Sequence, residues 1–160
     1  MSKEIRRPGW SFVVIVEGDD LVVTDTTATW FGGDSDPNDS GETASGYPTR
    51  GHPDLIACSL PMDYQGPDAA TRKAVGGSPI PMLPWGLDKH GNPRPGGTQV
   101  IVTRGETSLT MPLIDIGPAK WTRKGIDLTI AAFRALGGTK KHGVLPVSYR
   151  VLGGAKHLRD

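Results

Sequence analysis

The chain has 160 residues, of which 36% are hydrophobic and 22% are charged, and its formal net charge is +1. This length supports one domain with a real core, and the 22 glycines and 14 prolines indicate many turns and long loops. The lysines and arginines are scattered and form no basic stripe, which argues against nucleic acid as a partner. A single cysteine, Cys58, excludes an intramolecular disulfide and a cysteine metal cage.

Two features of the sequence bear on location. No apolar run approaches the length of a membrane span, so we expect no membrane segment. The stretch from Met1 to Trp10 is charged and is not followed by an apolar region with a cleavage pattern. No signal peptide is therefore visible in this chain.

The first part of the chain predicts a hairpin. Residues 1–9 show no periodic pattern and predict an unstructured lead-in. Two runs rich in β-branched residues, 11–17 and 21–31, are separated by a Gly-Asp-Asp turn and predict an antiparallel pair. A polar loop over 34–54 follows, and the small apolar residues 55–61 predict a short buried strand.

The second part begins with residues 62–97, which are rich in proline and glycine and predict an irregular insertion. Residues 98–104 and 108–115 predict a second hairpin. Residues 145–152 predict the last strand, with one apolar face formed by Leu145, Val147, Tyr149 and Val151.

One short helix is predicted over residues 129–136. Thr129 is a good N-cap, because its hydroxyl can accept a hydrogen bond from the first turn. Ile130, Phe133 and Leu136 share one face, and Gly137 stands where a C′ glycine belongs. A mainly β fold with one short helix is the class that these elements define.

Several blocks of this sequence resemble a known family. They are Asp115-Ile116-Gly117-Pro118, then Ile126-Asp127-Leu128-Thr129 with Ala132-Phe133 and Leu136-Gly137, and, earlier, Thr27 to Gly32 and Gly41 to Gly46. Together and in this order they resemble the double-psi β-barrel of the RlpA, expansin and family 45 endoglucanase group. Where lytic transglycosylases of this group carry a histidine, this chain has none, because the corresponding segment reads Ile-Ala-Cys-Ser-Leu-Pro over 56–61.

The resemblance implies a six-stranded double-psi β-barrel as a single domain over residues 1–160. Its core would lie at about 21–46 and 97–152, with an N-terminal hairpin extension and the inserted loop at 62–97. The resemblance also implies a secreted, periplasmic or cell-wall location, and we expect a monomer.

Asp115 and Asp127 are the candidate catalytic residues. Glycosidic bonds are cleaved with carboxylates, one of which donates a proton while another stabilises charge or activates water. The resemblance aligns Asp115 with the acid/base of lytic transglycosylases and Asp127 with the acid of family 45 glucanases. Taken alone, the residues also fit a turn aspartate and a helix-start aspartate. We expect both carboxylates in one open groove, with Thr29 near Asp115.

The candidate substrate-binding residues lie on the opening strand and on two loops. The resemblance places strand hydroxyls along a glycan groove, and an exposed aromatic ring can stack on a sugar face. Ordinary strand and core roles remain the alternatives for these residues, which are Thr27, Thr29, Trp30, Ser45 and Trp121.

No metal site and no cofactor are expected. The stretch Asp34-x-Asp36-x-Asn38-Asp39 hints at a calcium loop but lacks the glycine and glutamate that an EF-hand requires. A solvated loop is the better interpretation, although Asp34 or Asp36 could also serve as a base beside the cleft. The four histidines show no paired spacing.

The expected function is cleavage of the β-1,4 glycosidic bonds of a cell-wall glycan, most of all peptidoglycan. The reaction would be of the lytic transglycosylase or glycosidase type, with Asp115 as acid/base. Two alternatives stay open: an expansin-like module that binds or loosens polysaccharide without cutting it, and a structural module of a larger assembly.

Overall fold

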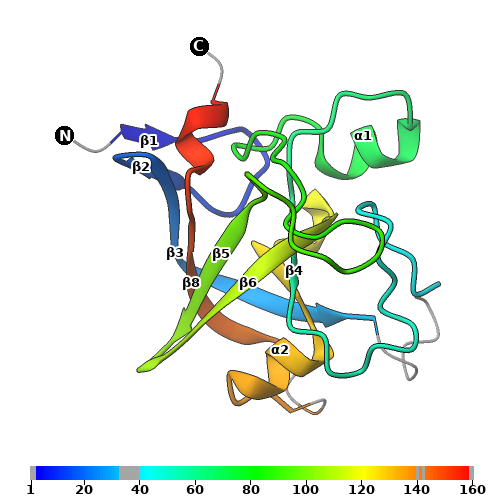
Figure 1. Cartoon of the computed structure of the whole chain (residues 1–160). Helices are drawn as coiled ribbons and strands as arrows, with labels where there is room; N and C mark the ends of the chain where they lie inside the picture. Colours follow the sequence, from blue (N-terminus) through cyan, green and yellow to red (C-terminus); the bar gives the residue numbers. More distant parts are fainter. Residues whose placement is uncertain (1–2, 33–39, 140, 142, 159–160) are drawn as a thin grey trace.

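The computed structural model describes residues 3–32, 40–139, 141 and 143–158. Strands dominate this part of the chain, and its helices are short (Figure 1). In chain order the elements are β1 (Lys3–Ile5), β2 (Val14–Glu17), β3 (Asp20–Phe31), β4 (Cys58–Leu60), α1 (Ala69–Val75), β5 (Gln99–Arg104), β6 (Thr107–Ile116), η1 (Lys120–Thr122), β7 (Ile126–Thr129), α2 (Ile130–Ala135), β8 (Leu145–Val151) and η2 (Gly154–His157).

Six of the described strands close into a barrel. The sheet runs β1-β2-β3-β7-β4-β6-β5-β8, and β8 returns to pair with β3, so β1 and β2 remain outside the ring. Within the ring β3 pairs with β7 and β4 with β6 in parallel, and the other neighbours are antiparallel. This mainly β, double-psi barrel with an N-terminal hairpin extension confirms the fold class predicted from the sequence.

The barrel interior is filled by alternate residues of the strands. The predicted apolar face of the last strand is confirmed, because Leu145, Val147, Tyr149 and Val151 are all at most 4% exposed. Cys58 is buried in the same core, where burial raises the pKa of its thiol. The hydroxyl of Tyr149 donates a 2.9 Å hydrogen bond to the carbonyl of Gly125, which satisfies both buried groups.

Two β-bulges change which residues face the interior. In β3, Asp25 has φ +53°, and the pairing with β8 shifts between Val23 and Thr26. In β6, Cys58 pairs with Leu113 but Ser59 pairs with Asp115, so the ladder skips Ile114. Because side chains alternate along a strand, an extra residue reverses the alternation beyond it. The far ends of β3 and β6 therefore present the opposite set of side chains to the core.

The predicted helix is α2. Thr129 caps it by accepting a hydrogen bond from the N–H of Ala132, and it also bonds the backbone of Leu55 and Ala57. Ile130, Phe133 and Leu136 are buried, as their spacing predicts. Gly137 has φ +89°, the left-handed conformation expected at C′.

The structure corrects three local predictions. The lead-in over 1–9 contains β1, which pairs with β2. Residues 126–129, for which no strand was predicted, form β7, because the barrel supplies a partner strand on each side. The insertion over 62–97 is irregular for most of its length but contains α1, whose first turn is capped by Asp68.

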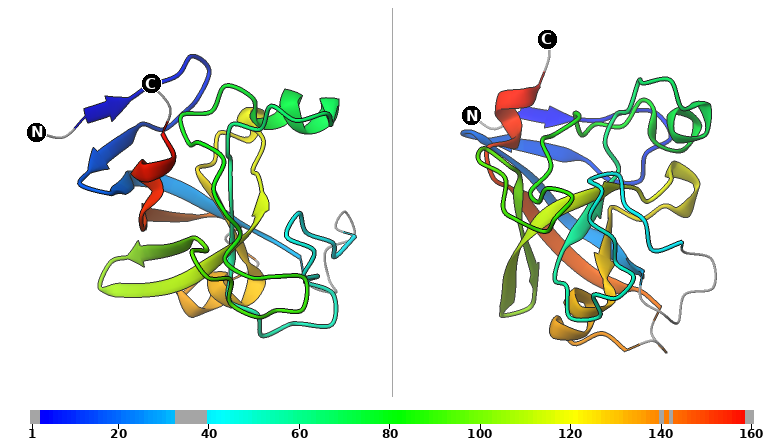
Figure 2. Two further views of the ribbon diagram at one scale, coloured as in Figure 1. Left: turned by 45° about the horizontal axis from the view of Figure 1, so that its top comes forward. Right: turned by 45° about the vertical axis from the view of Figure 1, so that its right-hand side comes forward.

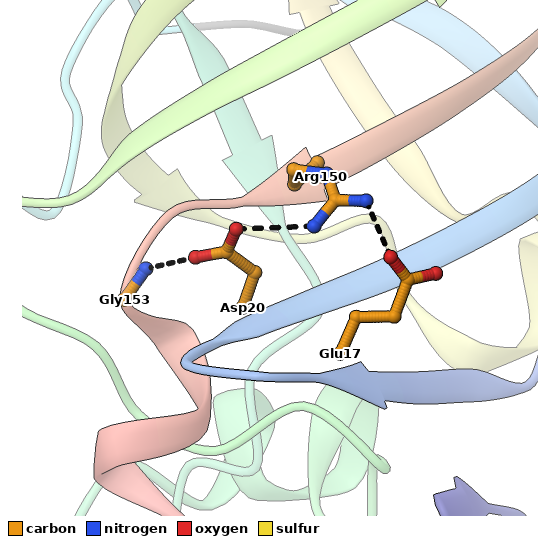
Figure 3. A network of polar contacts seen from close by, with 4 residues as sticks. All are labelled: Glu17, Asp20, Arg150 and Gly153. Atoms are coloured by element: carbon orange, nitrogen blue, oxygen red, sulfur yellow. Dashed lines mark hydrogen bonds and ion pairs between the residues drawn. The ribbon is translucent and has the colours of Figure 1, made fainter. Parts of the chain in front are cut away.

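The first part of the insertion with α1, the two N-terminal strands and η2 lie towards one end of the barrel, and α2 lies at the other (Figures 1 and 2). A polar network fixes η2 there (Figure 3). Asp20 accepts a 2.9 Å hydrogen bond from the N–H of Gly153 and forms a 3.1 Å ion pair with Arg150, which also pairs with Glu17 at 2.7 Å. The bond from Gly153 and the Arg150 guanidinium lower the pKa of Asp20.

Candidate functional site

Four polar side chains form a row across the barrel wall. The register pairs Thr29 of β3 with Asp127 of β7, Asp127 with Ser59 of β4, and Ser59 with Asp115 of β6. Residues directly opposite one another in a sheet point to the same side. We call Thr29, Asp127, Ser59 and Asp115 the polar row.

The polar row faces away from the barrel interior. Its sequence neighbours on β7 and β4 fill the core: Ile126, Leu128, Cys58 and Leu60 are all fully buried. The two bulges bring Thr29 and Asp115 to this same outer side, because each reverses the alternation just before the residue concerned. Without them, Asp115 would follow Met111 and Leu113 into the core.

Asp127 is the most perturbed member of the row. Its Oδ1 is buried and is without a hydrogen-bond partner in the described part of the chain, although the residue as a whole is half-buried. Burial and, to a smaller extent, the nearby charge of Asp115 raise the pKa of its carboxyl to about 7. The side chain is therefore substantially protonated near neutral pH.

Asp115 is held by backbone groups. Its Oδ1 accepts hydrogen bonds from the N–H of Ala44 at 3.0 Å and from that of its own neighbour Ile116 at 2.9 Å. The N–H of Ser45 donates to the carbonyl of Ile114 at 3.0 Å, so the segment around Ser45 docks along the end of β6. The structure thus places Ser45, one of the candidate substrate-binding residues, on a segment that contacts Asp115 and Ile114.

Ser59 is the member that sequence reasoning missed. It is 2% exposed, and its hydroxyl donates a 3.0 Å hydrogen bond to the carbonyl of Gly117. Gly117 has φ +139°, and a Cβ there would lie 3.4 Å from the Ser59 hydroxyl and 3.6 Å from Oδ2 of Asp127. The signal in the sequence was a lone hydroxyl in the middle of an otherwise apolar strand, directly before Leu60 and Pro61.

Of the predicted residues on β3, two lie on the outer face and one packs against the core. Thr27 and Thr29 share the outer face of β3, and the Thr29 hydroxyl donates to the carbonyl of Gly143 at 3.4 Å. Thr29 pairs directly with Asp127 and is separated from Asp115 by two strands, so the expected proximity of Thr29 to Asp115 is replaced by proximity to Asp127. Trp30 points the other way and packs against the core.

Trp121 lies in η1 and is 63% exposed, more than any other large apolar side chain that is described. The ring is available to a ligand, and within the described residues it takes part in none of the hydrogen bonds or ring contacts that hold the polar row. Asp34 and Asp36, the other candidate carboxylates, lie outside the described residues. Among the residues that are described, no group of three His, Cys, Asp or Glu could hold a metal ion.

Comparison with known proteins finds a similar fold but assigns the chain to no family. No family model matches the chain, and no curated protein sequence matches it. One solved structure with a similar fold is the Streptomyces papain inhibitor (SPI), at a TM-score of 0.48 and 20% identity over 84% of this chain and 96% of that chain. Similarity at this level assigns neither a family nor an activity. Within the described residues, no helix combines the length and apolar character needed to cross a bilayer.

The arrangement defines a double-psi β-barrel with a carboxyl pair on its outer wall. Asp127 can donate a proton near neutral pH, because its pKa lies there. Asp115 supplies a second carboxylate one strand beyond Ser59. Two strand spacings of about 4.8 Å place the two backbones roughly 10 Å apart.

Proposed function

We propose that this barrel cleaves a β-linked cell-wall glycan, most of all peptidoglycan, with Asp127 as the proton donor and Asp115 as the second carboxylate. The observation that carries the proposal is the carboxyl of Asp127, which is buried beside a second carboxylate and has a pKa of about 7. A pair of carboxyl groups whose environments differ is the usual arrangement for acid and base roles in glycosidic cleavage. The resemblance of the flanking residues to glycan-active barrels supports the same choice.

The division of labour follows from the surroundings of the two side chains. The resemblance to lytic transglycosylases favours Asp115 as acid/base, but the electrostatics favour Asp127 as the acid, since its environment disfavours the ionised form. Protonated Asp127 would transfer its proton to the leaving glycosidic oxygen. The oxocarbenium-like centre that develops would be stabilised by the charge of Asp115.

The second half of the reaction depends on the attacking hydroxyl. If water attacks, Asp115 takes its proton, as the base does in inverting enzymes, where roughly 6.5–9.5 Å between the carboxyl groups leaves room for the water. If a hydroxyl of the substrate's own muramic acid attacks, Asp127, which is ionised after protonating the leaving oxygen, takes the proton of that hydroxyl back, and a 1,6-anhydro end forms without water. Ser59 would fix the orientation of Gly117 through the hydrogen bond from its hydroxyl to the Gly117 carbonyl. Because Gly117 has no side chain, the space beside Oδ2 of Asp127 would stay open.

The test is incubation of the purified protein with peptidoglycan and, separately, with soluble β-glucans, followed by mass analysis of the products. We expect cleavage products from the wild type and a loss of about 10²–10⁴ in rate for Asp127→Asn, the range of a general acid. Asp115→Asn should also lose turnover. The matched control is Asp19→Asn. Asp19 is exposed in the turn between β2 and β3 and is not part of the polar row, so this variant should be fully active.

Binding without cleavage is the second candidate, and the exposure of Trp121 favours it, because a solvent-facing indole can stack on a sugar ring. It predicts pull-down on the insoluble glycan that is unchanged by Asp127→Asn and lost in Trp121→Ala. If neither product nor binding is found on any polymer, both candidates fail and the structural-module interpretation stands.

A further inference from the structure

A cavity separate from the polar row lies at the end of the barrel that carries the insertion. Its volume is about 570 Å³, within the range of about 300–1,000 Å³ that is common for small-molecule sites. Three stretches far apart in the sequence line it: the N-terminal segment at Arg7, the insertion, and the C-terminal segment at His157. None of the polar-row residues contributes to it.

The wall formed by the insertion is rigid. The hydroxyl of Ser78 donates to the carbonyl of Pro61 and accepts from the N–H of Ile80, which ties this part of the insertion to the end of β4. Tyr64 accepts a 3.1 Å hydrogen bond from the N–H of Asp68, and a Cβ on Gly66 would lie 2.5 Å from its ring, so the ring is packed tightly against backbone. A preformed wall lowers the ordering cost that a ligand would otherwise meet.

The same wall carries one oriented carboxylate. Oδ1 of Asp63 accepts hydrogen bonds from the side-chain amide of Gln65 and from the N–H of Gly77, both at 2.7 Å. Oδ2 has no hydrogen bond or ion pair within the described part of the chain. This oxygen is free to accept from a cationic group placed in the cavity.

The terminal segments contribute the guanidinium of Arg7 and the imidazole of His157 to the lining. The Arg7 guanidinium donates a 3.1 Å hydrogen bond to the adjacent carbonyl of Arg6, which leaves most of its five N–H donors available. His157 lies at the end of η2, which is fixed to the β2–β3 turn by the Asp20–Gly153 bond (Figure 3). The lining also contains apolar surface from Met82, which is 39% exposed, and from the neighbouring prolines.

We propose that this cavity binds a zwitterionic ligand of the amino acid or short-peptide class, with its ammonium group on Asp63 and its carboxylate on Arg7 and His157. An apolar side chain of the ligand would lie against Met82 and the prolines 79 and 81. A lining that holds both a carboxylate and a guanidinium favours a ligand with both charged ends, because a ligand with one charge would leave the other side chain unmatched. This site is independent of the glycan proposal and of the polar row.

The experiment titrates three probes, leucine, alanyl-leucine and alanyl-alanyl-leucine, into the full chain and follows binding by calorimetry and by amide chemical shifts. The three ligand lengths test how far Asp63 lies from Arg7 and His157. We expect saturable binding of at least one probe. Acetylating its amine or amidating its carboxylate should each weaken binding about fivefold to tenfold, since each removes one charge-assisted bond.

Variants assign the two ends of the ligand. In Asp63→Asn, which keeps the Oδ1 acceptor for Gly77, acetylation should no longer matter, whereas amidation should still weaken binding. In Arg7→Gln the pattern should reverse. Arg6→Gln and Asp54→Asn are matched controls, because Arg6 pairs with Glu4 and both residues lie outside the cavity lining.

Three results would overturn the proposal: no saturable binding of any probe at millimolar concentration, equal binding of the capped and free forms, or discrimination that survives both variants. The capping comparison uses the wild type alone, so it decides the matter even if a variant does not fold. Asp127→Asn should leave peptide binding unchanged, which separates failure of this site from failure of the glycan proposal.

Discussion

Replacing Asp127 by asparagine should change how the stability of the protein depends on pH. The pKa of this carboxyl rises from 3.8 to about 7 on folding, chiefly because burial disfavours its charge. The folded state therefore holds a proton that the unfolded state has already released. Between pH 4 and 7 the unfolded state binds fewer protons, so the free energy of unfolding must fall as pH rises.

The magnitude follows from linkage. A rise from 3.8 to about 7 corresponds to at most about 4 kcal/mol of stability, at 1.36 kcal/mol for each pH unit. This stability is fully present below pH 4, declines through the window from 4 to 7, and is gone above it. Asp20, Asp68 and Asp88 have lowered pKa values, so their contributions are lost only as pH falls below about 4.

The assay is urea denaturation of the wild type and Asp127→Asn at intervals from pH 4 to 8, with Asp19→Asn as the exposed control. Groups that titrate equally in both proteins cancel in the difference between them. We expect this difference to move in favour of Asp127→Asn by at most about 4 kcal/mol across the window, and the control to follow the wild type. Asp115→Asn should reduce the wild-type slope only in part, because the charge of Asp115 is the smaller cause.

A difference between Asp127→Asn and the wild type that stays constant from pH 4 to 8 would refute this reasoning. It would mean that Asp127 is as well solvated in the folded state as in the unfolded chain. The same result would remove the observation on which the catalytic proposal rests. A variant that is inactive yet more stable at pH 8 would, in contrast, identify a residue retained for function despite its cost in stability.

Three further changes test how the fold is held. Thr129→Val should cost about 2–3 kcal/mol, because it removes the α2 cap and the bonds to Leu55 and Ala57. Tyr149→Phe should cost about 1–2 kcal/mol, because the buried Gly125 carbonyl loses its donor. Arg150→Gln should cost less than about 1 kcal/mol, because its ion pairs are solvent-exposed. Urea denaturation at pH 7 measures all three. We expect the loss of stability to be larger where the broken bond is buried than where it is charged but exposed. A loss of stability for Arg150→Gln that equals or exceeds that for Tyr149→Phe would contradict this order. High salt should leave the Thr129 and Tyr149 effects unchanged and diminish the Arg150 effect.

Much of the fold could be predicted from local pattern. The spacing of Ile130, Phe133 and Leu136 with a threonine before and a glycine after is sufficient for a short helix, because caps and face are local properties. The alternation over 145–151 likewise indicated one apolar face of the last strand. The two candidate aspartates came from the resemblance of their flanking residues, and the structure places them on neighbouring parts of one wall.

Other features could not be read locally. Residues 126–129 are too few to show a strand period, and they are a strand because β3 and β4 lie on either side. In the sequence Ser59 is one small residue of a buried strand. Its position between Asp127 and Asp115 follows only from the pairing of β4 with β7 and β6. The cavity between Arg7, Asp63 and His157 joins segments far apart in the chain, which no local pattern records.

The sequence by itself thus determined most of the strands, though not β1 or β7, and where α2 begins and ends. The tertiary structure decided which way the site residues point. Bulges at Asp25 and Ile114 reverse the alternation of β3 and β6, and they turn Thr29 and Asp115 outward to meet Asp127. The physical reason is that the phase of a strand is set by pairing with its neighbours around a closed ring, and that pairing joins residues far apart in the chain.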